Sequence, residues 1–241
     1  LEGVWNNVED IKKDLLITKD ERIRYHKRLY SQKPILKVQN LKTWYPLKKG
    51  VFGRTYDYIK SVDDVSFDVY PGETLGLVGE SGCGKTTLGR SILRLVEPTS
   101  GKIIFDGKDI TLLNNSELRE YRKQVQIIFQ DPYSSLNPRM CIGDAIAEPL
   151  KVHGIESDAR KRRTRVCSLL EEVGLEASHY QRYPHEFSGG QRQRICIARA
   201  LAVNPKLIIC DESVSALDVS VQAQVLNLLN RLKRDFHFTY I

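Results

Sequence analysis

The alternation of apolar and polar positions from Pro34 onward predicts β-strands. In "ILKVQNLK" (35–42) and "VSFDVY" (65–70), apolar residues fall at about every second position, which is typical of half-buried antiparallel strands. The stretch between them, 45–61, mixes polar and aromatic residues with Pro and Gly, and it predicts a loop.

Two later stretches are apolar without interruption. "TLGLVG" (74–79) and "KLIICDE" (206–212) each hold a short apolar run, as expected for buried parallel strands. Helical spacing follows each run. "TTLGRSILRLV" places Leu88, Ile92 and Leu95 on one face, and the later helix has Val221, Val225, Leu228, Leu229 and Leu232. Strands that alternate with helices, with a glycine loop at a strand end, predict a parallel α/β core.

Residues 1–33 differ from the rest of the chain. Val8, Ile11 and Leu15 fall at helical spacing and predict a short amphipathic helix, whereas "KDERIRYHKR" (19–28) is almost wholly polar and predicts a charged linker. The chain begins with Leu rather than Met, so we expect it to be a piece of a longer protein or to carry added residues at its start. This segment is either a plain extension or a docking element.

Composition narrows the class of protein. With 241 residues, 41% hydrophobic and 28% charged, the chain can form one large α/β domain or two small ones. No apolar run approaches the ~18 residues that a membrane-spanning helix needs, and no secretory signal opens the chain. Five scattered cysteines without a CxxC pair indicate reduced thiols in an intracellular protein.

The net charge of +7 favours a nucleic-acid or acidic-membrane partner. Its densest cluster is "RKRRTR" (160–165). Because no aromatic residue interleaves that run, it lacks the stacking platform of a single-strand binder, and we interpret it as the solvated face of a helix.

The stretch "GESGCGKTT" carries the most specific chemistry. It fits G-x-x-x-x-G-K-[ST], a pattern in which bare backbone N–H groups, a lysine and a hydroxyl hold nucleotide phosphates and Mg²⁺. A plain glycine turn would need neither the lysine nor the hydroxyl at that offset. The predicted phosphate-binding residues are Gly79, Glu80, Ser81, Gly82, Cys83, Gly84, Lys85, Thr86 and Thr87.

A phosphate loop of this kind requires an acidic residue at the end of a second strand. Asp211 follows four apolar residues and is predicted to hold Mg²⁺ through water, with Thr86 as a direct ligand. Glu212 comes next, and because neighbouring strand residues point to opposite faces, it is better placed to orient or deprotonate the attacking water. The alternative is that the two carboxylates merely end a strand.

A second anion site follows from "FSGGQRQRICIARAL" (187–201). Bare amides and a hydroxyl stand immediately before a helix predicted to begin near Gln191, and such a helix N-terminus attracts phosphate. Two phosphate-binding devices on one chain suggest that two chains share two nucleotides. The residues of this second site are Ser188, Gly189, Gly190 and Gln191.

The order "GESGCGKTT", "FSGGQRQR", "LIICDE" and "SALD" resembles the ATPase domain of ABC transporters, over about residues 34–241. The resemblance implies a P-loop α/β fold with a mixed core sheet, an antiparallel β subdomain and an inserted helical subdomain at about 131–195. In that family two such domains pack head to tail. Each ATP then lies between the phosphate loop of one subunit and the signature serine and glycines of the other.

Three further positions match that family. Gln130 in "IIFQDP" matches the glutamine that senses Mg²⁺ and water and connects to the helical subdomain. Tyr45 matches the aromatic residue that stacks on adenine, with Trp44 and Tyr56 as rivals because stacking tolerates any π-face. Asp218 in "SALD" matches the loop that crosses the dimer interface. The resemblance thus implies Glu212, Gln130 and Lys85 as catalytic residues, and Thr86, Gln130 and Asp211 around the metal.

Three stretches narrow the resemblance further. "QDPYSSLNPRM", the "LKKG" insertion and "SALDVSVQAQVLNLL" resemble importer ATPases for oligopeptides, dipeptides and nickel. This implies ATP and Mg²⁺ as cofactors, a second ATPase subunit (identical or related), integral membrane permease subunits, and a place on the cytoplasmic face of the cell membrane. The solute stays open. One alternative is a soluble ABC ATPase acting on nucleic acid or ribosomes, although we expect no nucleic-acid partner.

The end of the chain limits what this fragment is expected to do. The family places a switch histidine at the end of the strand after the last predicted helix, and here that strand begins at "HFTYI" (237–241). His237 lies too early in the strand to serve. We therefore expect a C-terminally truncated domain without the last core strands. Such a fragment would either hydrolyse ATP or only bind it.

Overall fold

The computed structural model describes residues 18–49, 54–212 and 217–241, which form two sheets. The antiparallel sheet has the strand order β2-β1-β3-β4, and the second sheet is parallel with the order β5-β6-β7. The strands are β1 Leu36–Lys49, β2 Arg54–Val69, β3 Ser100–Phe105, β4 Lys108–Asp109, β5 Val125–Ile128, β6 Leu207–Cys210 and β7 Thr239–Tyr240.

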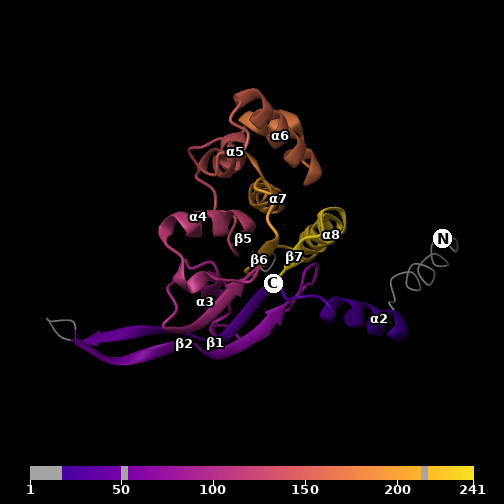
Figure 1. Ribbon diagram of the computed structural model, residues 1–241. Helices are drawn as coiled ribbons and strands as arrows, with labels where there is room; N and C mark the ends of the chain where they lie inside the picture. The colour runs from indigo at the N-terminus through magenta and orange to yellow at the C-terminus, as the bar shows by residue number, and fades with distance from the viewer. Residues whose placement is uncertain (1–17, 50–53, 213–216) are drawn as a thin grey trace.

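Apart from α2, the helices are grouped on one side of the antiparallel sheet. In Figure 1, α5 and α6 lie at the end of the molecule opposite that sheet, and α7 lies between them and the parallel strands. The helices are α2 Lys19–Tyr30, α3 Lys85–Ile92, α4 Asn115–Gln124, α5 Ile142–Val152, α6 Ala159–Glu172, α7 Gly189–Leu201 and α8 Val219–Phe236, with 3₁₀ turns at Ile110–Leu112, Ala177–Gln181 and Pro184–Glu186.

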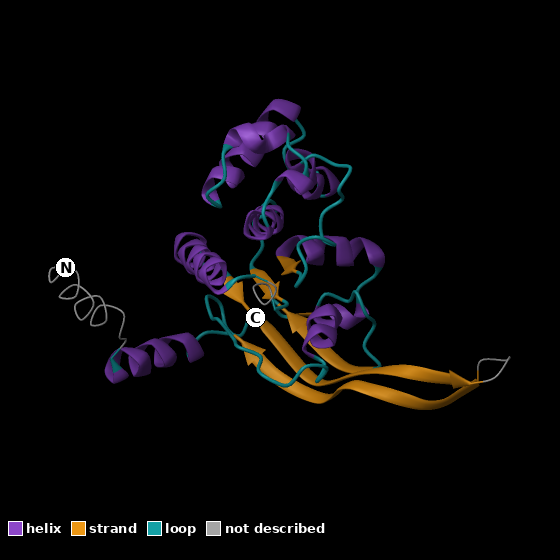
Figure 2. Cartoon of the chain, turned by 180° about the vertical axis from the view of Figure 1, so that it is seen from behind, coloured by secondary structure: helices purple, strands orange, loops and turns teal. Residues whose placement is uncertain are grey.

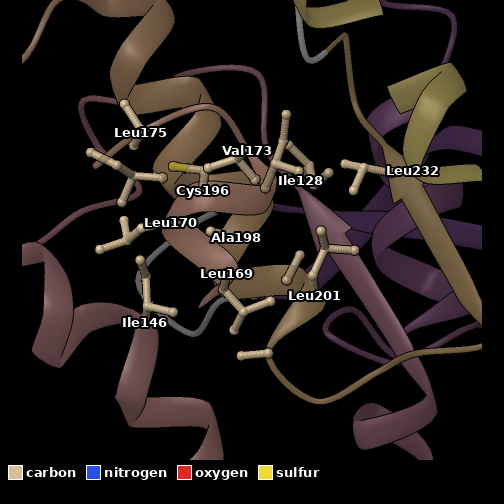
Figure 3. Packing of buried hydrophobic residues seen from close by; sticks show 14 of the residues in the cluster. Ile128, Ile146, Leu169, Leu170, Val173, Leu175, Cys196, Ala198, Leu201 and Leu232 are labelled. Atoms are coloured by element: carbon tan, nitrogen blue, oxygen red, sulfur yellow. The ribbon is translucent and has the colours of Figure 1, made fainter. Parts of the chain in front are cut away.

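Strand β6 is buried on both faces, as its apolar run predicted. Leu207 and Ile209 pack in the core beneath α3, with strands of the antiparallel sheet. Ile208, which points the other way, belongs to the core formed with α5, α6, α7 and α8. Figure 3 shows this second core, where side chains from several helices meet around Cys196 and Ala198. The parallel sheet therefore lies between two hydrophobic cores.

The predicted loop at 45–61 is wrong over most of its length. Strands β1 and β2 continue through it as a long antiparallel hairpin, in which Tyr45 faces Ile59 and Pro46 faces Tyr58. Figure 2 shows this hairpin as an arm that projects beyond the helices. The aromatic and β-branched residues of "TYDYI" favour strand geometry. The sequence pattern did not predict the strand because both faces of the arm are exposed.

The predicted strand at 74–79 is also largely wrong. Among the described residues, only its start is paired, through the bridge between Thr74 and Tyr240 and the hydrogen bond from Leu75 N to Tyr240 O (2.9 Å). Strand β7 spans two residues and offers no partner beyond that point. Val78 is 98% exposed, so apolarity alone was misleading here.

The predicted charged linker at 19–28 is a helix, α2. Thr18 and Glu21 form a capping box, with Thr18 N donating to Glu21 Oε2 (2.8 Å) and Glu21 N to Thr18 Oγ1 (3.2 Å). Leu29 is buried, and the ring of Tyr30 meets that of Tyr70 edge to face at 5.0 Å. These contacts hold the helix against the core. The amphipathic helix predicted around Val8, Ile11 and Leu15 lies outside the described residues.

The two predicted helices after the glycine loop and before the C-terminus are present as α3 and α8. Leu88 and Ile92 are buried as predicted, but Leu95 is exposed because α3 ends at Ile92. On α8, Val225, Leu228, Leu229 and Leu232 are buried, and Val221 is partly so. All five cysteines are free thiols in the structure.

Candidate functional site

The phosphate-loop pattern folds into a turn that opens α3. Gly82 has φ +82° and Gly84 has φ +97°, and Gly84 is the residue that caps the helix. A Cβ on Gly84 would lie 2.0 Å from the main-chain O of Ser61 on β2, whereas one on Gly82 would meet no atom of the described residues within 4 Å. Glycine is therefore required at 84 both for its left-handed backbone and for its close approach to β2.

Lys85, the first residue of α3, reaches across the loop. Its Nζ donates to Gly79 O (2.8 Å) and Glu80 O (2.9 Å), and lies 3.7 Å from Glu212 Oε1. The ammonium group is thus held among oxygens at the mouth of the loop. That is where a bound phosphate chain would need a cation.

Thr86 and Asp211 come together as the sequence predicted. Thr86 Oγ1 donates to Asp211 Oδ1 at 2.8 Å, although 125 positions separate the two residues. Asp211 follows β6 directly, and its N–H donates to Ile128 O at the end of β5 (3.0 Å). Gly89 lets α3 pack closely on β6, since a Cβ there would lie 3.1 Å from Ile209 Cγ2. This packing sets the loop at the carboxyl ends of the parallel strands.

Glu212 also turns toward the loop. The residue has φ +46°, a left-handed conformation that breaks the strand's alternation. Gln130, after β5, donates from Nε2 to Glu212 Oε2 at 3.1 Å. Lys85, Asp211 and Glu212 line one cavity of about 350 Å³. The predicted catalytic residues therefore converge on one place.

The hairpin distinguishes Tyr45 from one of its rivals. Thr43 and Tyr45 share one face of β1, and Thr43 Oγ1 lies 2.9 Å from Ser91 Oγ on α3. Trp44 points to the opposite face, where Lys60 Nζ lies 4.7 Å from the centre of its ring. Tyr45 is 38% exposed, on the face of the phosphate-loop helix. Tyr56 is 63% exposed near the hairpin tip.

The serine-glycine-glycine-glutamine turn begins α7. Ser188 caps the helix: its N donates to Gln191 Oε1 (3.0 Å) and its Oγ accepts from Gln191 N (3.3 Å). The helix starts at Gly189, two residues before the predicted Gln191. Serine and glutamine thus form a capping box at a helix N-terminus whose dipole favours anions.

The glycines of that turn have a second role in packing. A Cβ on Gly190 would lie 2.4 Å from Val221 Cγ1 on α8, and one on Gly189 would lie 3.4 Å from Leu217 Cδ2. Asp218 is the N-cap residue of α8 but makes no side-chain cap. Among the described residues, the atoms nearest to a Cβ on either glycine belong to Leu217 and α8 rather than to the phosphate loop. The turn therefore packs against the start of α8, near Asp218.

One contact at the loop was missed from the sequence. Ser61 Oγ donates to Thr87 Oγ1 at 2.8 Å, in addition to the approach of its carbonyl to Gly84. Lys60 pairs with Trp44 and Val62 with Thr43, so Ser61 is the extra residue of a β-bulge. No sequence pattern reveals a contact that depends on an irregularity in strand pairing.

The oxygens present fit a hard cation rather than a transition metal. Among the described residues no group of three or more His, Cys, Asp or Glu could hold a metal. Mg²⁺ needs less protein than that, since it usually takes one or two carboxylates and substrate phosphates. Thr86 Oγ1 and the buried Asp211, 9% exposed, supply a suitable pair of oxygens.

In the described part of the chain, no helix combines the length and the apolar character needed to cross a bilayer.

Residues 62–215 match the ABC transporter family. The glutathione import ATP-binding protein GsiA of Escherichia coli strain K12 is 56% identical over 215 residues, which cover 89% of this chain and 34% of that protein. GsiA of Shigella boydii serotype 4 matches equally. The chain thus spans about a third of these curated relatives.

Solved structures show the same fold. The dimeric ATP-binding cassette MJ0796, in a post-hydrolysis state with ADP and Pi, aligns with a TM-score of 0.73 at 29% identity over 85% of each chain. CbiO1 from Clostridium perfringens, part of the ABC transporter complex cbiONQ, aligns with a TM-score of 0.71 at 26% identity over 87% of this chain and 78% of that one. The family match, the relatives and the fold agree: this chain belongs to the ABC transporter family, as an ATP-binding domain.

Proposed function

We propose that the chain is the ATP-binding and ATP-hydrolysing part of an importer for small peptides. The observation that carries the proposal is the convergence of Lys85, Thr86, Asp211, Glu212 and Gln130 at the carboxyl ends of two parallel strands. Residues 34–241 would form the ATPase domain, with a helical subdomain at about 131–195 and an extension at 1–33.

Each residue has a role that follows from its position. The amides of Gly79 to Thr87 would cradle the phosphates, and Lys85 Nζ would exchange its main-chain acceptors for β- and γ-phosphate oxygens. Glu212 is the general base for the attacking water. Gln130 donates a hydrogen bond to the Glu212 carboxylate and so orients that carboxylate. Tyr45 would stack on the adenine from the hairpin.

Mg²⁺ would neutralise the charge that builds up on the β- and γ-phosphates. Thr86 Oγ1 and Asp211 are the residues that would hold it, with Gln130 beside them. Metal binding would need only a local change of partner at Thr86, because the hydroxyl that donates to Asp211 is the group that would turn to the metal. A carboxylate as buried as Asp211 is well suited to hold a cation.

The α7 turn would complete the site from another subunit. Ser188, Gly189, Gly190 and Gln191 present a capped helix N-terminus that suits a γ-phosphate, and Asp218 lies beside it. A head-to-tail pair of ATPase subunits would bring this turn over the loop of its mate. The cassette MJ0796, which is dimeric, supports the pairing of two such subunits.

The import function rests on the relatives. The matched proteins are named for glutathione import, and glutathione is a short peptide, so we propose a peptide-class solute, with nickel as the alternative within the same branch. Permease subunits in the cell membrane would be the partners, with this chain on the cytoplasmic face. CbiO1, which belongs to the cbiONQ transporter complex, is a precedent for such an assembly.

A nucleic-acid function is not favoured. The basic cluster 160–165 lies on α6, and several of its arginines have partners within the chain. Arg162 Nη1 donates to Glu156 O (2.7 Å), and Arg165 Nε to Ala202 O (3.2 Å). The Arg163 guanidinium lies 4.6 Å from the ring centre of Tyr180. These groups serve packing and capping, which weakens the case for a polyanion surface.

The test is Glu212→Gln in the protein. General-base assistance contributes about 10²–10⁴ in rate, so turnover should fall by that factor while ATP binding persists. The matched control is Glu97→Gln, which changes an exposed carboxylate paired with Arg94 and should leave the rate unchanged. If E212Q hydrolyses ATP at the rate of the unmodified protein, Glu212 is not the base.

A further inference from the structure

We infer that Ser61 is a positioning residue for nucleotide binding: it orients the Thr87 hydroxyl so that this hydroxyl donates to the phosphate nearest the nucleoside. The inference rests on the proposed function and extends it to a residue outside the phosphate-loop pattern. The carrying observation is the 2.8 Å hydrogen bond in which Ser61 Oγ donates to Thr87 Oγ1.

The direction of that bond fixes where the Thr87 proton can go. A hydroxyl has one proton and two lone pairs, so an oxygen that accepts from Ser61 keeps its own proton for another acceptor. Thr87 lies in the first turn of α3, immediately behind the glycines of the loop. A phosphate oxygen held by the loop would be such an acceptor.

The two threonines of the loop face different ends of the site. Thr86 donates to Asp211, which places it on the side of the metal and the terminal phosphate. Thr87 contacts β2 instead, on the side of the hairpin that carries Tyr45. Because Tyr45 is the proposed base platform, Thr87 belongs to the nucleoside end of the phosphate chain.

The backbone holds Ser61 in place for this role. As the extra residue of the bulge, it is not paired with β1, and its carbonyl lies against Gly84. The same residue therefore contacts the loop through its main chain and its side chain. Its hydroxyl is partly buried, so water competes less for the bond.

The test measures ADP binding by calorimetry in EDTA. Because EDTA removes divalent metal, replacing a phosphate oxygen by sulfur cannot change the affinity through metal binding. Losing one hydrogen bond should weaken binding by about two- to tenfold in Ser61→Ala and in Thr87→Val. The double variant should lose no more than T87V alone, because both act through one hydroxyl. Ser61→Thr keeps the donor and should restore affinity. Ser66→Ala, which removes another β2 hydroxyl, should have no effect.

An α-thio analogue of ADP supplies a readout that a merely structural role would not move. Sulfur accepts hydrogen bonds weakly, so one diastereomer should bind the unmodified protein about two- to tenfold less tightly than ADP, and that difference should disappear in T87V and shrink in S61A. Additive losses in the double variant, or an unchanged thio effect in S61A, would overturn the inference. Failure of the unmodified protein to bind ADP at all would instead overturn the proposed function.

Discussion

Gly84→Ala tests whether the loop's shape depends on its fit against β2. The substitution adds one methyl group, which would lie 2.0 Å from Ser61 O in a left-handed backbone of φ +97°. A left-handed conformation costs a non-glycine residue roughly 1–2 kcal/mol. In addition, the loop or the bulge must move by about 1 Å to reach the 3.0 Å below which real Cβ contacts essentially never occur.

That movement should affect binding more than stability. A misplacement of about 1 Å in a site can cost roughly 10²-fold in function, so we expect ADP affinity to fall by about 10–100-fold. Calorimetry measures this loss, and urea unfolding measures the accompanying change in stability, which should include the ~1–2 kcal/mol of backbone strain.

A matched control separates strain from collision. Gly107→Ala also introduces a side chain at positive φ (+80°), between β3 and β4, but meets nothing within 4 Å. It should lower stability by a similar ~1–2 kcal/mol and leave ADP affinity unchanged. If G84A binds ADP as tightly as G107A does, the close approach of Ser61 to Gly84 has no part in shaping the phosphate site.

The remaining predictions concern the α7 turn and a buried thiol. Gly190→Ala should lower the free energy of unfolding by about 1–3 kcal/mol, because its Cβ would lie 2.4 Å from Val221 Cγ1. Gly189→Ala, whose Cβ would lie 3.4 Å from Leu217 Cδ2, should lower it by less. Equal losses in urea melts would contradict this. Burial raises the pKa of the Cys196 thiol to about 11. At pH 9 the folded protein should therefore be alkylated at the exposed Cys83 well before Cys196, and equal labelling by mass spectrometry would refute this.

The chemistry of the site could be predicted from the sequence because it resides in short stretches. The loop pattern ending in Lys85 and Thr86, and the acidic pair after an apolar strand, each combine residue type with position. The structure brings Thr86 within hydrogen-bond distance of Asp211 and places Lys85 Nζ 3.7 Å from Glu212 Oε1. The α8 core face was predictable for the same reason, since its apolar residues repeat at helical spacing.

What was missed depends on exposure and on contacts between distant segments. The hairpin arm has two exposed faces, so its strands lack the alternation that burial imposes. The polar helix α2 is held by its cap and by Leu29 rather than by an apolar stripe. The bond from Ser61 to Thr87 requires a bulge in β2, which no local pattern encodes.

Lys85 is proposed to hold the phosphates of a bound nucleotide. Lys85→Ala, compared with Lys206→Ala, tests this role most directly, because Lys206 is an exposed lysine that pairs with Asp106 at 2.6 Å, away from the loop. We expect K85A to lose ATP affinity by about tenfold or more in calorimetry, since charge-assisted bonds contribute roughly 1.5–3 kcal/mol, while K206A binds normally. Equal ATP affinity in K85A and the unmodified protein would contradict this role.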